Sequence, residues 1–102
     1  VDNMLVSGGE NIYPQEVEMA LEDHADVREA AVIGIDDEEW GDRVAAVVVG
    51  DVTAAALDEH CLAHGELADF KRPRSYAVTA EPLPRSDTGT LLRDRIREAH
   101  FE

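Results

Sequence analysis

The sequence has 102 residues, enough for one domain with a modest core, and its hydrophobic fraction of 44% is ordinary for a globular domain. Its 23 acidic and 9 basic residues give a formal net charge of −14, which repels phosphate backbones and argues against a nucleic-acid partner. No apolar run approaches the roughly 18 residues that a membrane span needs, and no signal peptide is visible. Because the single cysteine cannot form an internal disulfide, we expect a cytoplasmic protein.

The beginning of the chain predicts a strand, a turn and a helix. Met4–Val6 is a short apolar run that ends at Ser7–Gly9, a pattern typical of a brief strand followed by a glycine turn. Pro14 suits the first turn of a helix, and apolar residues recur after it at helical spacing. We expect this helix to end near Ala25.

The middle of the chain predicts a hairpin and a second helix. β-Branched and apolar residues fill Val27–Ile35 and Val44–Val49, which indicates two largely buried strands. The polar stretch Asp36–Arg43 between them suits a long hairpin loop. Thr53 then has the side chain of an N-cap for a helix that runs to about His64.

The last third predicts a strand, a loop and a final helix. Ser75–Ala80 has the composition of a third strand in the same sheet, and Leu92, Ile96 and Ala99 follow one helical face. Strands joined by a hairpin favour antiparallel pairing, so the expected fold class is α+β, a small mostly antiparallel sheet packed with helices. The sequence has neither a dinucleotide-binding GxGxxG after a strand nor a P-loop motif.

Two groups of polar side chains invite a ligand. His60, Cys61 and His64 lie close together, but two histidines on one helix face do not complete a zinc site, so we expect no metal and interpret Cys61 as a core residue. Cations gather at Lys71, Arg72 and Arg74, which suggests an anionic ligand in so acidic a protein. The arginines near the C-terminus either serve the same purpose or complement the dipole of the last helix; they are Arg85, Arg93, Arg95 and Arg97.

Four segments together resemble motifs of the adenylate-forming superfamily, in the acyl-CoA or aryl-CoA synthetase version. The first contains the wording SGGENIYPQEVE, the second ends in Trp-Gly, the third resembles a YKxP motif and the fourth an LPRxxTGKxxR motif. They are Val1–Glu18, Val32–Gly41, Leu67–Arg74 and Leu83–Arg93. The resemblance covers essentially the whole chain in the family's order, and its third segment is similar to that of 4-chlorobenzoate-CoA ligase-like enzymes.

The resemblance implies that residues 1–102 are the mobile C-terminal (lid) domain of an AMP-forming acid–CoA ligase. A large N-terminal domain, absent from this chain, would bind ATP with Mg2+ and activate a carboxylic acid as the acyl-adenylate. The lid domain would then rotate so that CoA attacks the adenylate. ATP and CoA are therefore expected as substrates, with nothing bound tightly by this domain alone, and the isolated domain is expected to be inactive. The acid is not readable from this part of the protein.

The resemblance also assigns roles to single positions. Asp2 matches the hinge between the two domain orientations, and its place near the first residue suggests a chain cut at the domain boundary. Gly8 and Gly9 match the loop that lines the pantetheine tunnel, where a missing Cβ lets the backbone approach a thin ligand. Without the flanking motif, an ordinary linker aspartate and a tight turn would explain these residues equally well.

The resemblance also matches four further positions to contacts with the CoA nucleotide. Their chemistry suits that role, since an aromatic face can stack on adenine and guanidinium groups pair with phosphate. They are Trp40, Phe70, Arg72 and Arg74. For Trp40, a partly buried anchor of the hairpin is the structural alternative.

Thr90 departs from the family pattern. The resemblance places a lysine there, which would put positive charge beside the adenylate phosphate in the first step. Threonine cannot supply that charge, and Lys71 is the only lysine in the chain. Three explanations stay open: an engineered substitution, a natural enzyme that has lost or relocated this role, or a shifted motif. The structural alternative for Thr90 is an N-cap of the last helix. Two other functions stay open: loading of an acyl group onto the pantetheine arm of a carrier protein, or a degenerate domain that binds CoA or a partner without catalysis.

Overall fold

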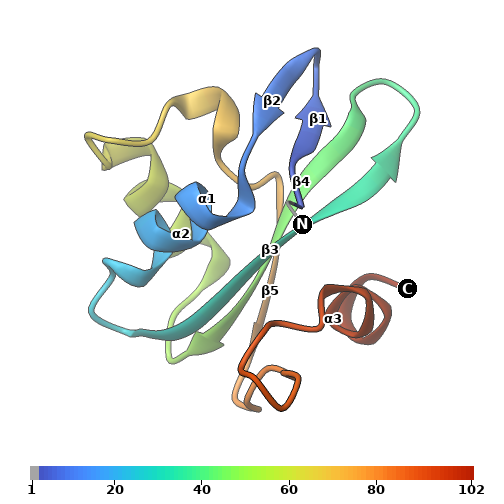
Figure 1. Ribbon diagram of the computed structural model, residues 1–102. Coiled ribbons are helices and arrows are strands. Elements are labelled where there is room, and N and C mark those ends of the chain that lie inside the picture. Colours follow the sequence, from blue (N-terminus) through green and yellow to red (C-terminus); the bar gives the residue numbers. More distant parts are fainter. Residues whose placement is uncertain (1–2) are drawn as a thin grey trace.

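The computed structural model describes residues 3–102, so the hinge prediction for Asp2 lies outside the described residues. Within this range the chain forms a five-stranded sheet with three α-helices and one short 3-10 helix (Figure 1). The strands are β1 (Leu5–Ser7), β2 (Glu10–Ile12), β3 (Val27–Asp37), β4 (Gly41–Gly50) and β5 (Ser75–Thr79). The helices are α1 (Pro14–Glu22), α2 (Ala54–Ala63), the 3-10 helix η1 (Asp69–Lys71) and α3 (Arg93–Phe101).

The sheet confirms the predicted α+β class. Strands β2, β1, β4 and β3 lie in that order and pair antiparallel, whereas β5 pairs parallel with β4. Because the crossover from β4 to β5 passes through α2 and η1, the chain can return to the same end of the sheet before β5 begins. The short strand β2 and the helix η1 are elements that the sequence analysis did not predict.

The hairpin between β3 and β4 is tighter than predicted. The pairing continues to Asp37 opposite Gly41, so three residues rather than the polar stretch 36–43 form the connection. One carboxylate oxygen of Asp37 accepts hydrogen bonds from the backbone N–H groups of Glu39 and Trp40, each at 2.9 Å. Gly41 has a φ of +85°, which a residue with a side chain rarely adopts. These two features close the turn and carry Trp40 at its tip.

The helix ends also refine the predictions. Thr53 caps α2 as expected, since its Oγ1 accepts the N–H of Ala56 at 3.1 Å. Helix α1 ends at Glu22, three residues before the predicted end. The alternative that Thr90 caps the last helix is wrong, because α3 begins at Arg93 with Leu92 in the cap position.

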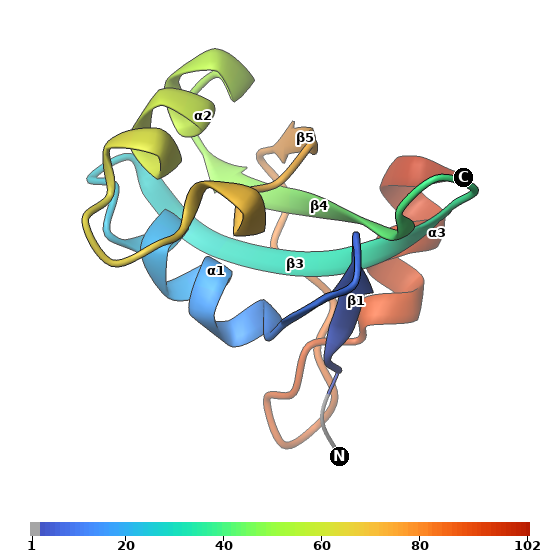
Figure 2. The same cartoon turned by 90° about the horizontal axis from the view of Figure 1, so that it is seen from above.

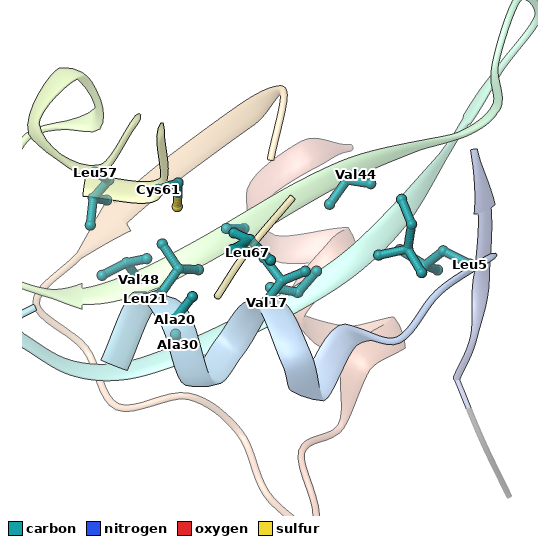
Figure 3. Close-up of a cluster of buried hydrophobic side chains, with 13 residues drawn as sticks. Leu5, Val17, Ala20, Leu21, Ala30, Val44, Val48, Leu57, Cys61 and Leu67 are labelled. Atoms are coloured by element: carbon teal, nitrogen blue, oxygen red, sulfur yellow. The ribbon is translucent and has the colours of Figure 1, made fainter. Parts of the chain in front are cut away.

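Hydrophobic side chains cover both faces of the sheet. Figure 1 shows α1 and α2 on one side of the sheet and α3 on the other, and Figure 2 shows α1 and α2 near one end of the long β3–β4 hairpin and α3 near its tip. Side chains alternate along β4, so Val44, Ala46 and Val48 face α1 and α2 while Val47 and Val49 face α3. Figure 3 shows the larger cluster, in which Val17 and Leu21 of α1 and Leu57 of α2 point toward the sheet. In the described part of the chain, no helix is long and apolar enough to cross a membrane.

Candidate functional site

The glycine turn between β1 and β2 packs against the tip of the β3–β4 hairpin. The N–H of Gly8 donates to the carbonyl oxygen of Trp40 at 2.8 Å. Gly8 has a φ of +59°, and a Cβ added there would lie 3.1 Å from Cε3 of the indole ring. Gly9 has a φ of +83°, but a Cβ there would meet no atom within 4 Å. The turn therefore needs glycine for its conformation, and at Gly8 also for its contact with Trp40.

Trp40 and Arg74 meet at the same end of the domain. The guanidinium carbon of Arg74 lies 5.4 Å from the centroid of the indole ring, within the range of a cation–π contact. The N–H of Arg74 donates to Val44 O at 2.8 Å, which fixes its backbone beside β4 at the entry to β5. Trp40 is 44% exposed and Arg74 is also exposed, so both present surface to solvent.

A cavity of about 350 Å³ lies beside this pair, lined by Ser7, Asp37, Trp40, Arg43 and Arg74. The structure thus brings Gly8, Trp40 and Arg74 together, although they are far apart in the sequence. We call the region formed by Gly8, Gly9, Trp40 and Arg74 the glycine-turn end.

Phe70 and Arg72 belong to the η1 segment and make different contacts. Phe70 is 45% exposed, and Nζ of Lys71 lies 5.7 Å from its ring centroid. Nε of Arg72 donates to Oδ1 of Asp58 at 3.0 Å, and the hydroxyl of Tyr76 donates to the same oxygen at 3.2 Å. The guanidinium of Arg72 therefore neutralises a carboxylate of α2, whereas the side chain of Arg74 has no such partner among residues 3–102.

Thr90 lies in a tight loop between β5 and α3. The N–H of Gly89 donates to Ser86 O at 2.9 Å, and the N–H of Ser86 donates to Thr90 O at 2.8 Å. The N–H of Thr90 donates to Oγ of Ser86 at 3.2 Å. Arg85 braces the loop from one side by donating to Gly89 O at 3.0 Å and to Glu29 at 3.1 Å. The backbone around Thr90 is therefore held in place, and its exposed side chain faces outward.

A buried ion pair anchors this loop to the sheet. Nη1 of Arg93 donates to Oε2 of Glu18 at 2.6 Å and to Val32 O at 2.7 Å, while the N–H of Val32 donates to the same carboxylate oxygen at 2.8 Å. Strand β3 is at the edge of the sheet, so these bonds occupy backbone groups that no neighbouring strand reaches. Nε of Arg97 donates in the same way to Gly34 O at 2.8 Å.

Most cations are already paired. Six of the nine lie within 4 Å of a carboxylate, namely Arg43, Lys71, Arg72, Arg85, Arg93 and Arg97. Of the other three, Arg74 lies at the glycine-turn end and Arg95 lines a cavity with Thr90. The third, Arg28, is exposed on β3. Two of the three cations without an ion pair to a described carboxylate therefore lie beside loops that the sequence resemblance assigns to function.

The two loops lie at opposite ends of the domain. In Figure 1 the β1–β2 turn and the hairpin tip lie at the upper end, whereas the loop between β5 and α3 lies at the lower end. A partner surface that covers the glycine-turn end therefore lies about one sheet length away from the loop between β5 and α3 (Figure 1).

The histidine and cysteine group has a structural arrangement. Nε2 of His60 lies 2.7 Å from Ala20 O, and Nε2 of His64 lies 2.7 Å from a carboxylate oxygen of Asp23, so both histidines join α2 to α1. Cys61 is fully buried, as predicted, and burial raises the pKa of its thiol. Within residues 3–102, no three His, Cys, Asp or Glu side chains gather in an arrangement that could hold a metal ion.

Sequence reasoning missed Arg43, which lines the cavity beside Trp40. Its position three residues after the tryptophan could have indicated it, but the predicted loop Asp36–Arg43 placed residue 43 in the loop and not in a strand. With the hairpin closed at Asp37 and Gly41, residue 43 becomes a strand residue close to the tip.

The sequence of this chain is similar to those of known ligase domains. Residues 16–90 match the family of AMP-binding enzyme C-terminal domains. A 4-chlorobenzoate–CoA ligase of Pseudomonas sp. (strain CBS-3) is 46% identical over 102 residues, which cover 96% of this chain and 19% of the relative. A 2-succinylbenzoate–CoA ligase of Bacillus pumilus is 40% identical over 99 residues, which cover 97% of this chain and 20% of the relative.

A solved structure has the same fold. The o-succinylbenzoate CoA synthetase from Bacillus subtilis, bound to a product analogue, matches with a TM-score of 0.87 and 39% identity over 98% of this chain and 20% of its own. The chain thus spans about a fifth of the length of the curated relatives it matches. By fold, by sequence identity and by its matched residues, the chain belongs to the AMP-binding enzyme C-terminal domain family, in a form similar to that of 4-chlorobenzoate–CoA ligases.

Proposed function

We propose that this chain is the mobile C-terminal domain of an AMP-forming acid–CoA ligase. A large N-terminal domain activates a carboxylic acid with ATP to the acyl-adenylate and releases pyrophosphate. The C-terminal domain then rotates, and the thiol of CoA attacks the adenylate to give the thioester and AMP. ATP and CoA are substrates, and the N-terminal domain is the principal partner of the residues described here.

The observation that carries the proposal is the contact of Trp40 with both the glycine turn and Arg74. The exposed indole offers an aromatic surface on which adenine stacks, and the guanidinium 5.4 Å from it offers a cation for phosphate. Gly9, beside which a Cβ would meet no atom within 4 Å, leaves room for the thin pantetheine arm. Nucleotide and arm of one CoA molecule would therefore meet adjacent parts of the glycine-turn end.

The two-ended arrangement supports a change of orientation between the steps. The Thr90 loop and the glycine turn lie at opposite ends of the domain (Figure 1), so one active site meets them in turn rather than together. Thr90 stands where the resemblance expects a lysine. We therefore propose that this protein forms the adenylate slowly unless another cation, such as Arg95 in the same cavity, takes the part of the lysine.

Magnesium would accompany ATP in the large domain. Since no arrangement for a metal ion is found among residues 3–102, we assign no ligand of the ion to this domain. This domain supplies the backbone of the glycine turn, an aromatic surface and guanidinium groups.

The test uses the intact protein that contains this chain. It is incubated with ATP, Mg2+, CoA and a panel of aryl and aliphatic acids, and both AMP and acyl-CoA are measured by mass spectrometry. The proposal predicts equal amounts of AMP and thioester with at least one acid, and no thioester without ATP. AMP without thioester on free CoA, followed by thioester on an added carrier protein, would instead favour loading of a carrier. A protein that binds CoA yet forms neither product with any acid would be a degenerate domain.

A further inference from the structure

We propose that Arg43, acting with Arg74, binds the 3′-phosphate of CoA and so selects CoA over its dephosphorylated form. The inference rests on the proposed function, because it names the part of the substrate that this end of the domain recognises. Arg43 comes from β4 and Arg74 from the entry to β5, and both line the cavity beside Trp40.

Arg43 has donors that the protein does not use. Its Nε is buried and has no hydrogen-bond partner among the described residues. Its Nη1 lies 3.8 Å from Oδ2 of Asp37, which is beyond hydrogen-bond distance. The side chain is 42% exposed, so its remaining donors are open to a ligand in the cavity. The nearby carboxylate of Asp37 therefore orients the guanidinium of Arg43, and its N–H groups can still donate hydrogen bonds to a phosphate.

Arg72 is less suited to this task, although the motif suggested it. Its Nε already bonds Asp58 at 3.0 Å and its Nη1 bonds Asp69 O at 3.2 Å. Binding a phosphate there would require the loss of these bonds and would leave Asp58 without its cation. Arg43 has only its 3.8 Å ion pair with Asp37, and Arg74 has no carboxylate partner among residues 3–102, so a phosphate there breaks no hydrogen bond and the structure favours this pair.

The charge of the pair matches one group of CoA better than the others. A phosphate monoester carries about −1.5 to −2 charges at pH 7, whereas each phosphate of a doubly esterified diphosphate carries about −1. The 3′-phosphate is the monoester of CoA, and it is attached to the ribose next to the adenine. With adenine on Trp40, two guanidinium groups beside the indole are placed for this phosphate.

Carboxylates near the cavity limit the affinity. Oδ1 of Asp37 is occupied by two backbone N–H groups of the turn, but Oδ2 faces Arg43, and Glu38 and Glu39 lie on the same tip. Their charges repel phosphate, and solvent screens the exposed guanidinium groups. We therefore expect the loss of Arg43 to weaken CoA binding by about three- to tenfold rather than to abolish it.

The experiment measures the Kd of CoA and of 3′-dephospho-CoA by titration calorimetry on the intact protein. Arg43→Gln should raise the Kd of CoA about three- to tenfold and leave that of dephospho-CoA within twofold. Arg43→Lys, which keeps the charge, should recover part of the loss. The matched control is Arg28→Gln, which lies about 23 Å away along β3 at the strand rise per residue, because Arg43 is paired with Ile35, and it should leave both Kd values unchanged.

The outcomes separate this inference from the proposed function. Equal changes for both ligands in Arg43→Gln, or no change for CoA, would overturn the phosphate assignment even if the protein forms thioester. The expected pattern in a protein that forms no thioester would support the phosphate site and refute the ligase. No binding of CoA by the unaltered protein would overturn both. Circular dichroism of each variant verifies that the fold is retained.

Discussion

The ion pair between Glu18 and Arg93 should be a principal support of the last helix, and Arg93→Met tests it. The two side chains are only 10% and 14% exposed, and with Val32 they form three hydrogen bonds of 2.6 to 2.8 Å. Methionine keeps much of the volume but removes the charge and both donors. The substitution leaves the carboxylate buried with a single partner and leaves Val32 O on the edge of β3 without its donor.

The expected cost follows from this geometry. Removing one partner of a buried ion pair typically costs about 3–5 kcal/mol, and the slight exposure here favours the lower end. About 3 kcal/mol corresponds to a decrease in Tm of about 12–24 °C in a domain of this size. Urea denaturation of the 102-residue chain, followed by circular dichroism, measures the free energy of unfolding.

A double-mutant cycle separates the ion pair from general damage. Glu18→Gln combined with Arg93→Met should cost less than the sum of the single substitutions, because neither charge is then left unpaired. The control Arg28→Met changes an exposed arginine and should stay within about 0.5 kcal/mol. A cost below about 1 kcal/mol for Arg93→Met, or strict additivity in the cycle, would refute the reasoning.

Three other predictions concern the loops and the thiol. Gly8→Ala should lower stability by about 1–2 kcal/mol and slow thioester formation, because its Cβ meets Trp40 in addition to the strain of a positive φ. Gly9→Ala adds only that backbone strain, so equal stability losses of the two variants in urea denaturation would contradict the contact with Trp40. Because burial raises the pKa of Cys61, the folded chain should react with a thiol reagent at pH 8 at least tenfold more slowly than the urea-unfolded chain, and fast reaction of the native state would contradict the burial. Thr90→Lys in the intact protein should raise pyrophosphate release about 10²–10³-fold and barely change thioester formation from supplied acyl-adenylate. If pyrophosphate release is already fast with threonine, Arg95→Gln should slow it; no effect there would exclude Arg95 as the substitute cation.

Local patterns predicted most of the secondary structure. The run of β-branched residues in β3 and β4 predicted two buried strands, and Thr53 predicted the start of α2, because both signals act over a few residues. The length of the hairpin loop was wrong, since the bonds that close it depend on the orientation of one aspartate side chain. That orientation has no signature in composition or periodicity.

The candidate site was predictable only as a set of positions. The motifs named Trp40 and Arg74 separately, but their contact arises from the pairing of β5 with β4. Sequence patterns also did not indicate which carboxylates pair with the other cations. Arg72 meets Asp58 across 14 residues and Arg93 meets Glu18 across 75, so which guanidinium is free depends on the tertiary structure. Arg43 could therefore enter the argument only once the hairpin was known.

The central claim is that the glycine-turn end serves the CoA step and not the adenylation step. The most direct measurement is a pair of rapid-quench experiments on the intact protein carrying Trp40→Ala, one that follows pyrophosphate from ATP and the acid and one that follows acyl-CoA from supplied acyl-adenylate. Removing the indole takes away the proposed surface for adenine and the contact partner of both Gly8 and Arg74. The account predicts an unchanged rate of pyrophosphate release and a thioester rate reduced at least tenfold at subsaturating CoA. Equal slowing of both products, or a thioester rate that stays at the level of the unaltered protein, would contradict it.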